Sequence, residues 1–415
     1  MKAAALLSFL FSTPAFAADS AAVAINELGL DLHRRLAAES ADANLCVSPY
    51  SIQCALAMTY AGADGKTRTE MAKVLHYPAG DAIHDALPAL NKALADIADE
   101  TKAEADSSKK YGGSAEPIVL TMANRLFGRK GYAFHEKFLA QLKNTYHAPL
   151  EETDFSQSVE ATKRINGWVE EQTRDRIKDL IPNGMLNGGT RLVLVNAVYL
   201  KAPWADAFRE AATQPEPFHI NGGGAQDVPT MRQQRHFGYA KRDGYTAVTI
   251  PYFGRKLQFL VILPDEVHGL ADVEKKLTAE ALADCARMGS QDVILHLPKF
   301  KIAGSTVSLT KELSALGMKT AFDVPAGSAD FSRMAPRTPS DYLFISEVLH
   351  KTFIAVDEKG TEAAAATAVI MRAGSAAPKD PPKPIEVKVD RPFLFAIQHA
   401  ESGACLFLGR VTEPK

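Results

Sequence analysis

A run of small residues directly after a strand-like stretch is the feature that most limits what this chain can fold into. The strand-like stretch, residues 343–356, is rich in β-branched and aromatic side chains and predicts one long buried strand. Gly360 follows and provides a hinge, and residues 363–366 are four successive alanines. Because alanine favours helices and disfavours strands, propensity alone predicts a short helix or a connector here.

Alternation within this run supports a second interpretation. Every second residue from 361 to 371 is uncharged, whereas Glu362 and Arg372 fall on the opposite face of an extended chain. One face of the run is therefore suited to burial between two strands. The proline-rich stretch 378–384 cannot join the interior of a sheet and predicts an exposed tether, and residues 385–389 predict another strand.

Five segments of the chain resemble those of an inhibitory serpin, a member of a family of serine protease inhibitors. Residues 358–367 resemble the family's hinge, residues 44–52 the segment that leads into its helix B, and residues 195–204 its strand 3A. Residues 390–395 and 406–411 resemble its C-terminal strands. The segments occur in the family's order and span nearly the whole chain, so the resemblance is more specific than any single motif.

This resemblance implies a fold. We expect an α+β serpin fold in which helices pack around three mainly antiparallel β-sheets and a reactive-centre loop, about residues 358–384, is exposed. A length of 415 residues alone would favour two or three domains. No linker or break in composition divides the chain, so we expect a single domain of residues 18–415.

The resemblance also implies a function, that of an irreversible suicide-substrate inhibitor of serine and also cysteine endopeptidases. The target attacks the loop and forms an acyl-enzyme, and the cleaved loop inserts into the main sheet and traps it. A charge on the inward face of the inserted segment would be costly, and this face carries none. The implied hinge residues are Glu358, Gly360, Thr361, Glu362, Ala363, Ala364, Ala365, Ala366 and Thr367.

A non-inhibitory serpin-fold protein that binds small molecules or acts as a chaperone is the alternative. Such proteins often carry bulky or charged inward hinge residues, which this hinge lacks. We expect no cofactor, because Lys92, Lys102, Lys109 and Lys110 are interleaved with acidic residues and indicate a solvated face rather than a polyanion site. The expected partner of this monomer is a target protease in a covalent acyl complex.

Four further residues are implied to control the opening of the sheet. By resemblance, Ser51, Asn196 and His350 form the shutter, beneath the point where central strands separate, and Trp204 occupies the breach, where the loop first enters. The ordinary alternative is that the polar residues are hydrogen-bonded core residues and that Trp204 is a packed aromatic. In either case we expect conformational rather than catalytic roles.

Two bonds compete as the reactive bond. Inhibitory members usually place it sixteen residues after the acidic residue that opens the hinge, which gives the Gly374–Ser375 bond. The side chains favour the Arg372–Ala373 bond, because the acidic specificity pocket of a trypsin-like enzyme binds an arginine, whereas a glycine has no side chain to place in such a pocket. Met371 and Ala373 suit elastase-like or subtilisin-like targets. We expect cleavage at Gly374–Ser375 by count, with Arg372–Ala373 as the alternative.

Catalytic and metal motifs are incomplete in this sequence. Tyr60 occupies the first glycine position of a phosphate-binding loop at residues 60–67, and Leu139 replaces the second histidine of a zinc-protease motif that begins at His135. No Gly-x-Ser-x-Gly motif occurs, and no His/Cys spacing indicates a metal. We therefore expect a protein that is not an enzyme.

The chain begins with a basic start, an apolar stretch and an Ala-x-Ala site, which predict a signal peptide at residues 1–17. The mature protein is then expected to be secreted or periplasmic. No later apolar run approaches membrane-spanning length, and the formal charge of -2 indicates no general affinity for nucleic acid or anionic membranes.

Export raises the question of disulfides among Cys46, Cys54, Cys285 and Cys405. The resemblance places Cys46 and Cys405 on strands of one sheet, so this pair is the most plausible bridge. Four buried free thiols are the alternative, and we favour it.

Three predictions concern local structure. Ser48 is a good N-cap with Pro49 after it, and apolar residues on one face predict an amphipathic helix that ends at Gly62. Residues 158–180 predict a helix that lies across a sheet. The polar stretch 101–116 predicts a loop insertion.

Overall fold

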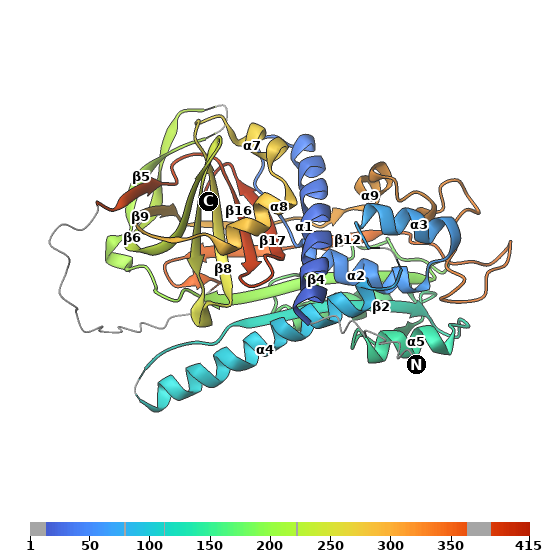
Figure 1. Ribbon diagram of the computed structural model, residues 1–415. Helices are drawn as coiled ribbons and strands as arrows, with labels where there is room; N and C mark the ends of the chain where they lie inside the picture. Colours follow the sequence, from blue (N-terminus) through green and yellow to red (C-terminus); the bar gives the residue numbers. More distant parts are fainter. Residues whose placement is uncertain (1–13, 79, 112, 221–222, 363–382) are drawn as a thin grey trace, which may run out of the picture.

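Two large sheets and the helices around them make up the computed structural model, which describes residues 14–78, 80–111, 113–220, 223–362 and 383–415 (Figure 1). Helix α1 stands at the centre, with one sheet on one side and a group of helices on the other (Figure 1). Residues 1–13 of the predicted signal peptide and residues 363–382 of the predicted loop lie outside the described residues. The predicted cleavage site after Ala17 falls in the first turn of α1, which begins at Pro14.

Nine strands of the described chain form one sheet: β1 (Leu45–Val47), β5 (Gln214–His219), β6 (Ala225–Arg242), β7 (Tyr245–Pro251), β8 (Leu257–Pro264), β9 (Ser290–Pro298), β15 (Ile385–Lys388), β16 (Phe393–His399) and β17 (Cys405–Val411). Eight form the other: β2 (Val119–Arg129), β3 (Glu151–Thr153), β4 (Leu192–Pro203), β10 (Phe300–Ala303), β11 (Val307–Ser308), β12 (Val348–Lys351), β13 (Phe353–Asp357) and β14 (Gly360–Thr361). Most pairs are antiparallel, as expected.

The α-helices of the described residues are α1 (Pro14–Glu39), α2 (Pro49–Gly62), α3 (Gly65–Val74), α4 (Ile83–Lys110), α5 (Glu136–Asn144), α6 (Ser158–Gln172), α7 (Leu270–Lys276), α8 (Ala279–Asp284) and α9 (Thr310–Leu316). Short 3-10 helices are η1 (Glu210–Ala212), η2 (Phe253–Arg255), η3 (Cys285–Arg287) and η4 (Thr320–Phe322). None of the helices in these ranges combines the length and apolar character needed to cross a membrane.

The α+β fold class is confirmed, but the three sheets expected from the resemblance appear as two. Strand β6 is 18 residues long and pairs with β9 over Thr230–Gly238 and with β7 over Gly238–Arg242. Because one continuous strand belongs to both pairings, it joins two of the expected sheets into one.

Helix α2 has the predicted ends but not the predicted amphipathic character. The Ser48 hydroxyl accepts a hydrogen bond from the Ser51 amide at 3.3 Å, Pro49 is the first helical residue, and the helix ends at Gly62. Every residue of α2 is buried. The helix contacts β17 of one sheet and β4 of the other, so both of its faces are covered.

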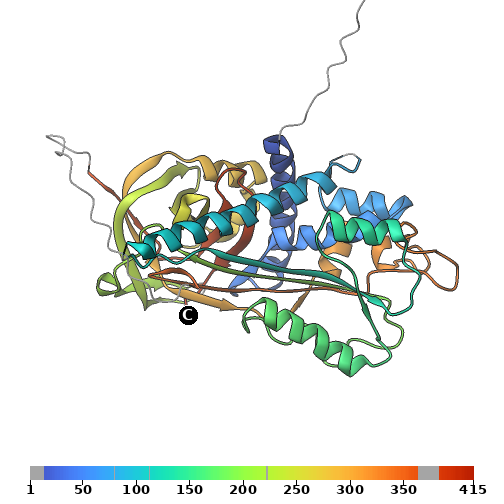
Figure 2. The ribbon, with the colours of Figure 1, turned by 90° about the horizontal axis from the view of Figure 1, so that it is seen from below.

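The predicted loop insertion at 101–116 is wrong up to residue 110, because α4 continues through it. Ile97, Thr101 and Ala105 recur at helical spacing and are all buried. The Thr101 hydroxyl donates to the Ile97 carbonyl at 2.8 Å and accepts from the Ile118 amide at 3.2 Å. One buried stripe therefore keeps this polar sequence helical, and α4 runs diagonally across the molecule in Figure 2.

Helix α6 lies across the eight-stranded sheet, as predicted (Figure 2). Ala161, Ile165 and Val169 pack against the sheet in a core separate from the main one. The helix ends at Gln172 rather than near residue 180, since the next residues Arg174 and Asp175 adopt left-handed backbone angles.

The long strand predicted at 343–356 is shorter and interrupted. Strands β12 and β13 cover only residues 348–357 and break at Thr352, whose hydroxyl donates to the Cys46 carbonyl at 2.8 Å. Before them, Ile345 is buried and its amide bonds to the Ala321 carbonyl instead of joining a ladder. The strand predicted at 385–389 is confirmed as β15.

All four cysteines are buried and free, so the bridge between Cys46 and Cys405 is not formed. Both lie in the same sheet, as the resemblance implied. The register of β1 against β17 pairs Cys46 with Gly409, four residues along the strand from Cys405. That offset is about 13 Å, beyond the reach of a disulfide.

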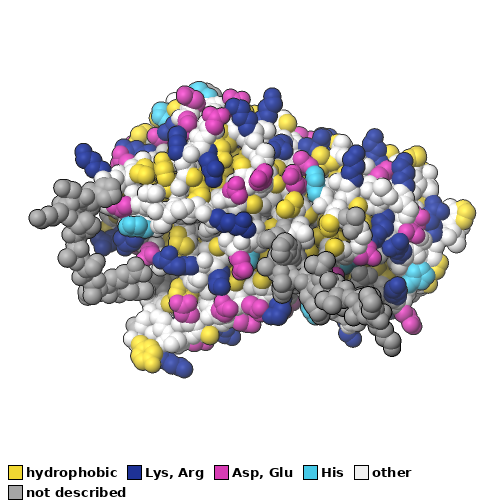
Figure 3. Space-filling view, in the orientation of Figure 1, with side chains coloured by type: hydrophobic (Ala, Val, Ile, Leu, Met, Phe, Trp, Pro, Cys, Tyr) yellow, Lys and Arg dark blue, Asp and Glu magenta, His cyan; other side chains and the backbone are white. Residues whose placement is uncertain are grey.

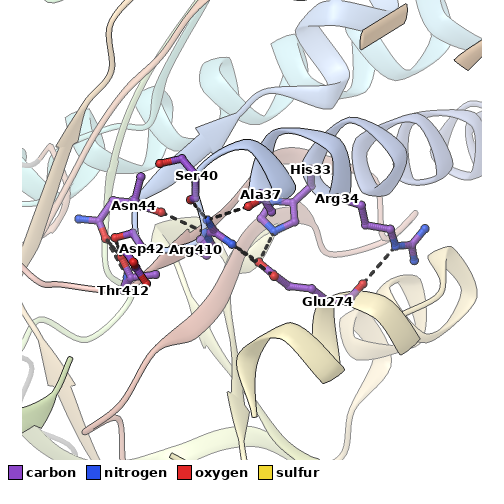
Figure 4. Close-up of polar contacts among 10 residues, drawn as sticks. His33, Arg34, Ala37, Ser40, Asp42, Asn44, Glu274, Arg410 and Thr412 are labelled. Carbon is purple, nitrogen blue, oxygen red and sulfur yellow. Dashed lines mark hydrogen bonds and ion pairs between the residues drawn. The ribbon is translucent and has the colours of Figure 1, made fainter. Parts of the chain in front are cut away.

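A buried ionic cluster ties α1 to the rest of the fold (Figure 4). The Glu274 carboxylate on α7 lies 2.9 Å from His33 Nε2 on α1 and 3.2 Å from Arg410 Nη1 on β17. Burial raises the pKa of Glu274, but hydrogen bonds from His33 and Arg410 outweigh it and hold that pKa below its usual value. One carboxylate thus joins a helix, a strand and a second helix.

Charges are interspersed over the surface face in Figure 3, where Lys and Arg alternate with Asp and Glu. Large exposed hydrophobic side chains among the described residues are scattered singly, at Val23, Tyr111, Val159, Val324 and Phe344. This distribution offers neither a broad apolar patch nor a single-sign field on that face.

Candidate functional site

The first residues of the predicted hinge already form a strand. Gly360 and Thr361, which make up β14, pair with Pro203 and Ala202 of β4 on one side and with β13 on the other. Gly360 has a φ of +151°, and a Cβ built there would lie 2.2 Å from the Ala202 carbonyl oxygen. Only glycine fits this position, which gives the predicted hinge glycine a structural reason.

Below β14 the eight-stranded sheet is not continuous. Strands β4 and β12 pair directly, in parallel, over Leu194–Ala197. Between that ladder and β14, the described residues form no ladder on the edge of β4 from 198 to 201 or on the facing edge from 352 to 354. We call this unpaired interval the slot. It lies in line with β14, so a continuation of β14 would run into it.

Trp204 and Tyr252 hold the hinge at the upper end of the slot. Their rings stack with centroids 4.7 Å apart. Trp204 donates from its backbone amide to the Lys359 carbonyl and from its indole Nε1 to the Asp357 carbonyl, each at 2.9 Å. The Tyr252 hydroxyl bonds to the Thr361 hydroxyl, and burial raises the pKa of Tyr252 well above its usual value.

Glu358, at the start of the hinge, is anchored by an ion pair. Its carboxylate lies 2.8 Å from Lys299 Nζ and accepts from the Thr213 hydroxyl at 2.7 Å. Burial raises the pKa of Glu358, but these bonds more than offset it and hold that pKa below its usual value. The Glu358 carbonyl also accepts from the Phe208 amide at 2.8 Å, so this residue is held at both backbone and side chain.

Glu362 is the last hinge residue that the structure describes. Its amide donates to the Ala355 carbonyl at 2.8 Å, and its carboxylate pairs with the Arg176 guanidinium. Burial raises the pKa of Glu362, and the pairing with Arg176 only partly opposes this. Hinge residues Ala363 to Thr367 and both candidate bonds, Arg372–Ala373 and Gly374–Ser375, lie outside the described residues.

The three predicted shutter residues meet at the lower end of the slot. Asn196 Nδ2 donates to Ser51 Oγ at 2.6 Å and to Asn124 Oδ1 at 2.8 Å. The Ser48 amide donates to His350 Nε2 at 3.0 Å, so the proton is on Nδ1, which donates to Asn196 Oδ1 at 2.9 Å. Burial lowers the pKa of His350 to about 4, which keeps the ring neutral.

Sequence reasoning missed several partners of these residues. Tyr252, Lys299, Thr213, Asn124 and Arg176 touch the predicted residues from distant parts of the chain. No local signal could have identified them, because an ordinary polar residue acquires such a role only through the approach of another strand. The exception is Ser48, whose predicted cap position also carries the amide that fixes the His350 tautomer.

The described part of the site offers neither a metal-binding cluster nor a reactive thiol. No group of three or more His, Cys, Asp or Glu side chains within the described ranges is arranged to hold a metal. Burial raises the pKa of Cys46, Cys54 and Cys405 to about 12 and that of Cys285 to about 11, so the thiols stay protonated. What the geometry offers instead is a place for an added strand.

Comparisons with known proteins agree with this geometry. The family model described as "Serpin (serine protease inhibitor)" matches residues 23–414. The leukocyte elastase inhibitor of Bos taurus is 38% identical over 395 residues, covering 93% of this chain and 97% of the relative. An uncharacterized serpin-like protein of Thermococcus kodakarensis is 40% identical over 394 residues, covering 94% and 85% respectively. The solved structure "Cleaved Serpin 42Da" has a TM-score of 0.80 and 28% identity, covering 96% of this chain and all 100% of the other.

Proposed function

The chain belongs to the serpin family, a family of protease inhibitors rather than enzymes, and from this premise we propose that it traps a serine protease by inserting its cleaved loop into the eight-stranded sheet. Strand addition by the reactive loop is the established behaviour of this family. The observation that carries the proposal is β14, where two hinge residues already lie between β13 and β4.

The register of β14 supports insertion of the residues that follow it. Thr361 lies opposite Ala202 of β4 and Val356 of β13. A strand extended in this register brings Ala365 opposite Val198, whose side chain is 1% exposed. The inward positions of the run are therefore buried after insertion, and their small uncharged side chains suit that environment.

The same register leads to the shutter. Six residues beyond Thr361, Thr367 comes between Asn196 and His350, which are hydrogen-bonded to each other in this structure. Neighbouring strands lie about 4.8 Å apart, so an inserted strand would separate β4 from β12 to about twice that spacing. Insertion must therefore break the bond between His350 and Asn196.

The proposed reaction divides into two steps. The nucleophile of the target protease attacks the loop carbonyl and forms an acyl-enzyme, with release of the new amino terminus. The freed hinge segment then enters the slot before water hydrolyses the ester. The relatives named leukocyte elastase inhibitors support a serine protease target. Within that class we propose trypsin-like, elastase-like or subtilisin-like enzymes, and a monomeric inhibitor that needs no cofactor.

A direct test mixes the purified protein with trypsin, elastase or subtilisin and looks for a complex that survives denaturing electrophoresis. Each protease with its catalytic serine changed to alanine is the control and should form none. The mass of the released C-terminal fragment identifies the bond, since it begins at residue 375 for Gly374–Ser375 and at residue 373 for Arg372–Ala373. Cleavage without any complex would contradict trapping and favour the non-inhibitory alternative.

We also propose that residues 1–17 are removed on export to the periplasm or the exterior. The apolar stretch before Ala17 supports this. Amino-terminal sequencing of the protein from its native host should begin at Ala18. A protein that stays inside the cell and still carries residues 1–17 would contradict the proposal.

A further inference from the structure

The segment that joins α6 to β4 crosses over the slot near the hinge. The Arg174 guanidinium lies 5.6 Å from the ring centroid of Tyr199 on β4. The Arg176 guanidinium lies 5.6 Å from the ring centroid of Phe353 on β13. Because these contacts reach strands on opposite sides of the slot, residues 173–178 form a strap across it.

The far end of the strap is attached to the sheet as well. Lys351 Nζ donates to the Lys178 carbonyl at 2.7 Å, next to the point where β12 ends. The strap backbone is locally unfavourable, since Arg174 and Asp175 have φ angles of 50° and 61°. Non-glycine residues rarely adopt such angles unless surrounding contacts compensate. The strap conformation therefore depends on what its side chains bind.

The strap's principal partner is the hinge. The Arg176 guanidinium pairs with the Glu362 carboxylate, and the Glu362 side chain is only 10% exposed. Arg174 and Lys201 also favour the charged form of this carboxylate. Three basic groups from the strap and β4 thus surround one acidic side chain, one residue after the last residue of β14.

We propose that Arg176, assisted by Arg174, is a positioning residue for loop insertion: it draws Glu362 under the strap and so keeps Gly360 and Thr361 seated in the sheet before the loop is cut. Starting the added strand is the least favourable step of insertion, because backbone conformational freedom is lost before many hydrogen bonds are gained. If the hinge is already paired with β4 and β13, insertion of the cleaved loop skips this step and competes better with hydrolysis of the acyl-enzyme. The inference rests on the proposed inhibitory function.

The structure provides a readout that needs no protease. The chain has two tryptophans, and Trp204 donates through its indole to the Asp357 carbonyl beside the hinge. In a Trp168→Phe background, Trp204 is the remaining tryptophan, so its fluorescence reports whether the hinge is paired with the sheet. Arg176→Ala and Glu362→Gln should each change this fluorescence in the same direction. Arg164→Ala, which removes an exposed α6 arginine that pairs with Glu151, is the matched control and should leave it unchanged.

The second readout is the number of inhibitor molecules consumed per protease molecule trapped. Arg176→Ala should raise it roughly threefold, the effect of a partly exposed ion pair. Arg176→Lys, which keeps a positive charge opposite Glu362, should restore it towards the wild-type value. Unchanged fluorescence and stoichiometry in Arg176→Ala would overturn the inference. Equal losses in Arg176→Ala and Arg176→Lys would also overturn it, because the packing of the strap, and not the charge opposite Glu362, would then be responsible.

The two proposals fail separately. If the wild-type protein forms no protease complex, the inhibitory function is wrong, while the fluorescence comparison still decides whether Arg176 seats the hinge. If complexes form but Arg176→Ala behaves like Arg164→Ala in both measurements, the inhibitory function stands and the role of Arg176 is rejected.

Discussion

His350 Nδ1 lies 2.9 Å from Asn196 Oδ1 at the position where β12 and β4 pair directly. This bond closes the lower end of the slot, while Trp204 and Thr361 define its upper end. A strand that enters from above must separate the two residues, so the polar cluster around them connects the stability of the uncleaved fold to loop insertion.

Burial of His350 predicts a loss of stability in acid. Its folded pKa is about 4 against 6.5 for an exposed histidine, so between these values the unfolded chain binds a proton that the folded chain does not. The free energy of unfolding should fall by about 3 kcal/mol from this group as the pH drops through that window. Urea unfolding of wild type and His350→Gln at pH 7 and pH 4.5 measures the difference. Identical pH dependences in the two proteins would contradict the assignment.

Gly360→Ala should unseat β14. The new Cβ would meet the Ala202 carbonyl at 2.2 Å with an unfavourable φ, so hydrogen exchange at the Glu362 amide should accelerate at least about tenfold. Gly304→Ala is the control, because its nearest heavy atom is the Thr352 carbonyl at 3.8 Å. Equal exchange rates in the two variants would show that β14 tolerates a side chain.

Ala365→Glu should convert an inhibitor into a substrate. The register of β14 buries position 365 on insertion, and an unpaired charge there costs several kcal/mol. Proteolysis of the loop should continue while the yield of denaturant-resistant complex drops at least about tenfold. Ala376→Glu places the same charge after both candidate bonds and should retain full complex yield. Undiminished trapping by Ala365→Glu would refute insertion in this register.

Glu274→Ala should destabilise the fold far from the slot. The side chains of Arg410 and His33 are 3% and 1% exposed, and without the carboxylate Arg410 would be a buried unpaired charge. We expect a loss of about 3 to 5 kcal/mol in urea unfolding. Glu280→Ala on α8, an exposed position, should change stability by less than about 0.5 kcal/mol. A loss no larger than the control's would mean that Figure 4 shows a cluster of little energetic weight.

Much of the site could be predicted because its signals are local. The cap at Ser48, the hinge glycine and the uncharged alternate positions after it follow from backbone conformation and side-chain size. The three shutter residues were identified by resemblance, and the structure brings them together. Their bonds to Asn124 and Ser48 could not be predicted, since each depends on how α2 meets two strands.

The errors have a common physical origin. Helix α2 is predicted to be amphipathic but is buried on all sides, and the polar stretch after Thr101 is helical because one narrow stripe of it is covered. The spacing of apolar residues along a helix does not show how many other helices or strands pack against it. The prediction of one long strand at 343–356 is wrong for a similar reason, because strand propensity does not show which backbone groups pair with a neighbouring strand.

By itself the sequence determined the fold class, through the resemblance of five segments to one family. It also determined the glycine hinge and a segment whose alternate side chains are small enough to be buried, because these depend on residue type and spacing. Only the tertiary structure decided where β14 sits, in which register, and that Arg176, Tyr252 and Lys299 hold it. These contacts join residues more than 50 positions apart in the chain, and their geometry exists only once two sheets and the strap have packed together.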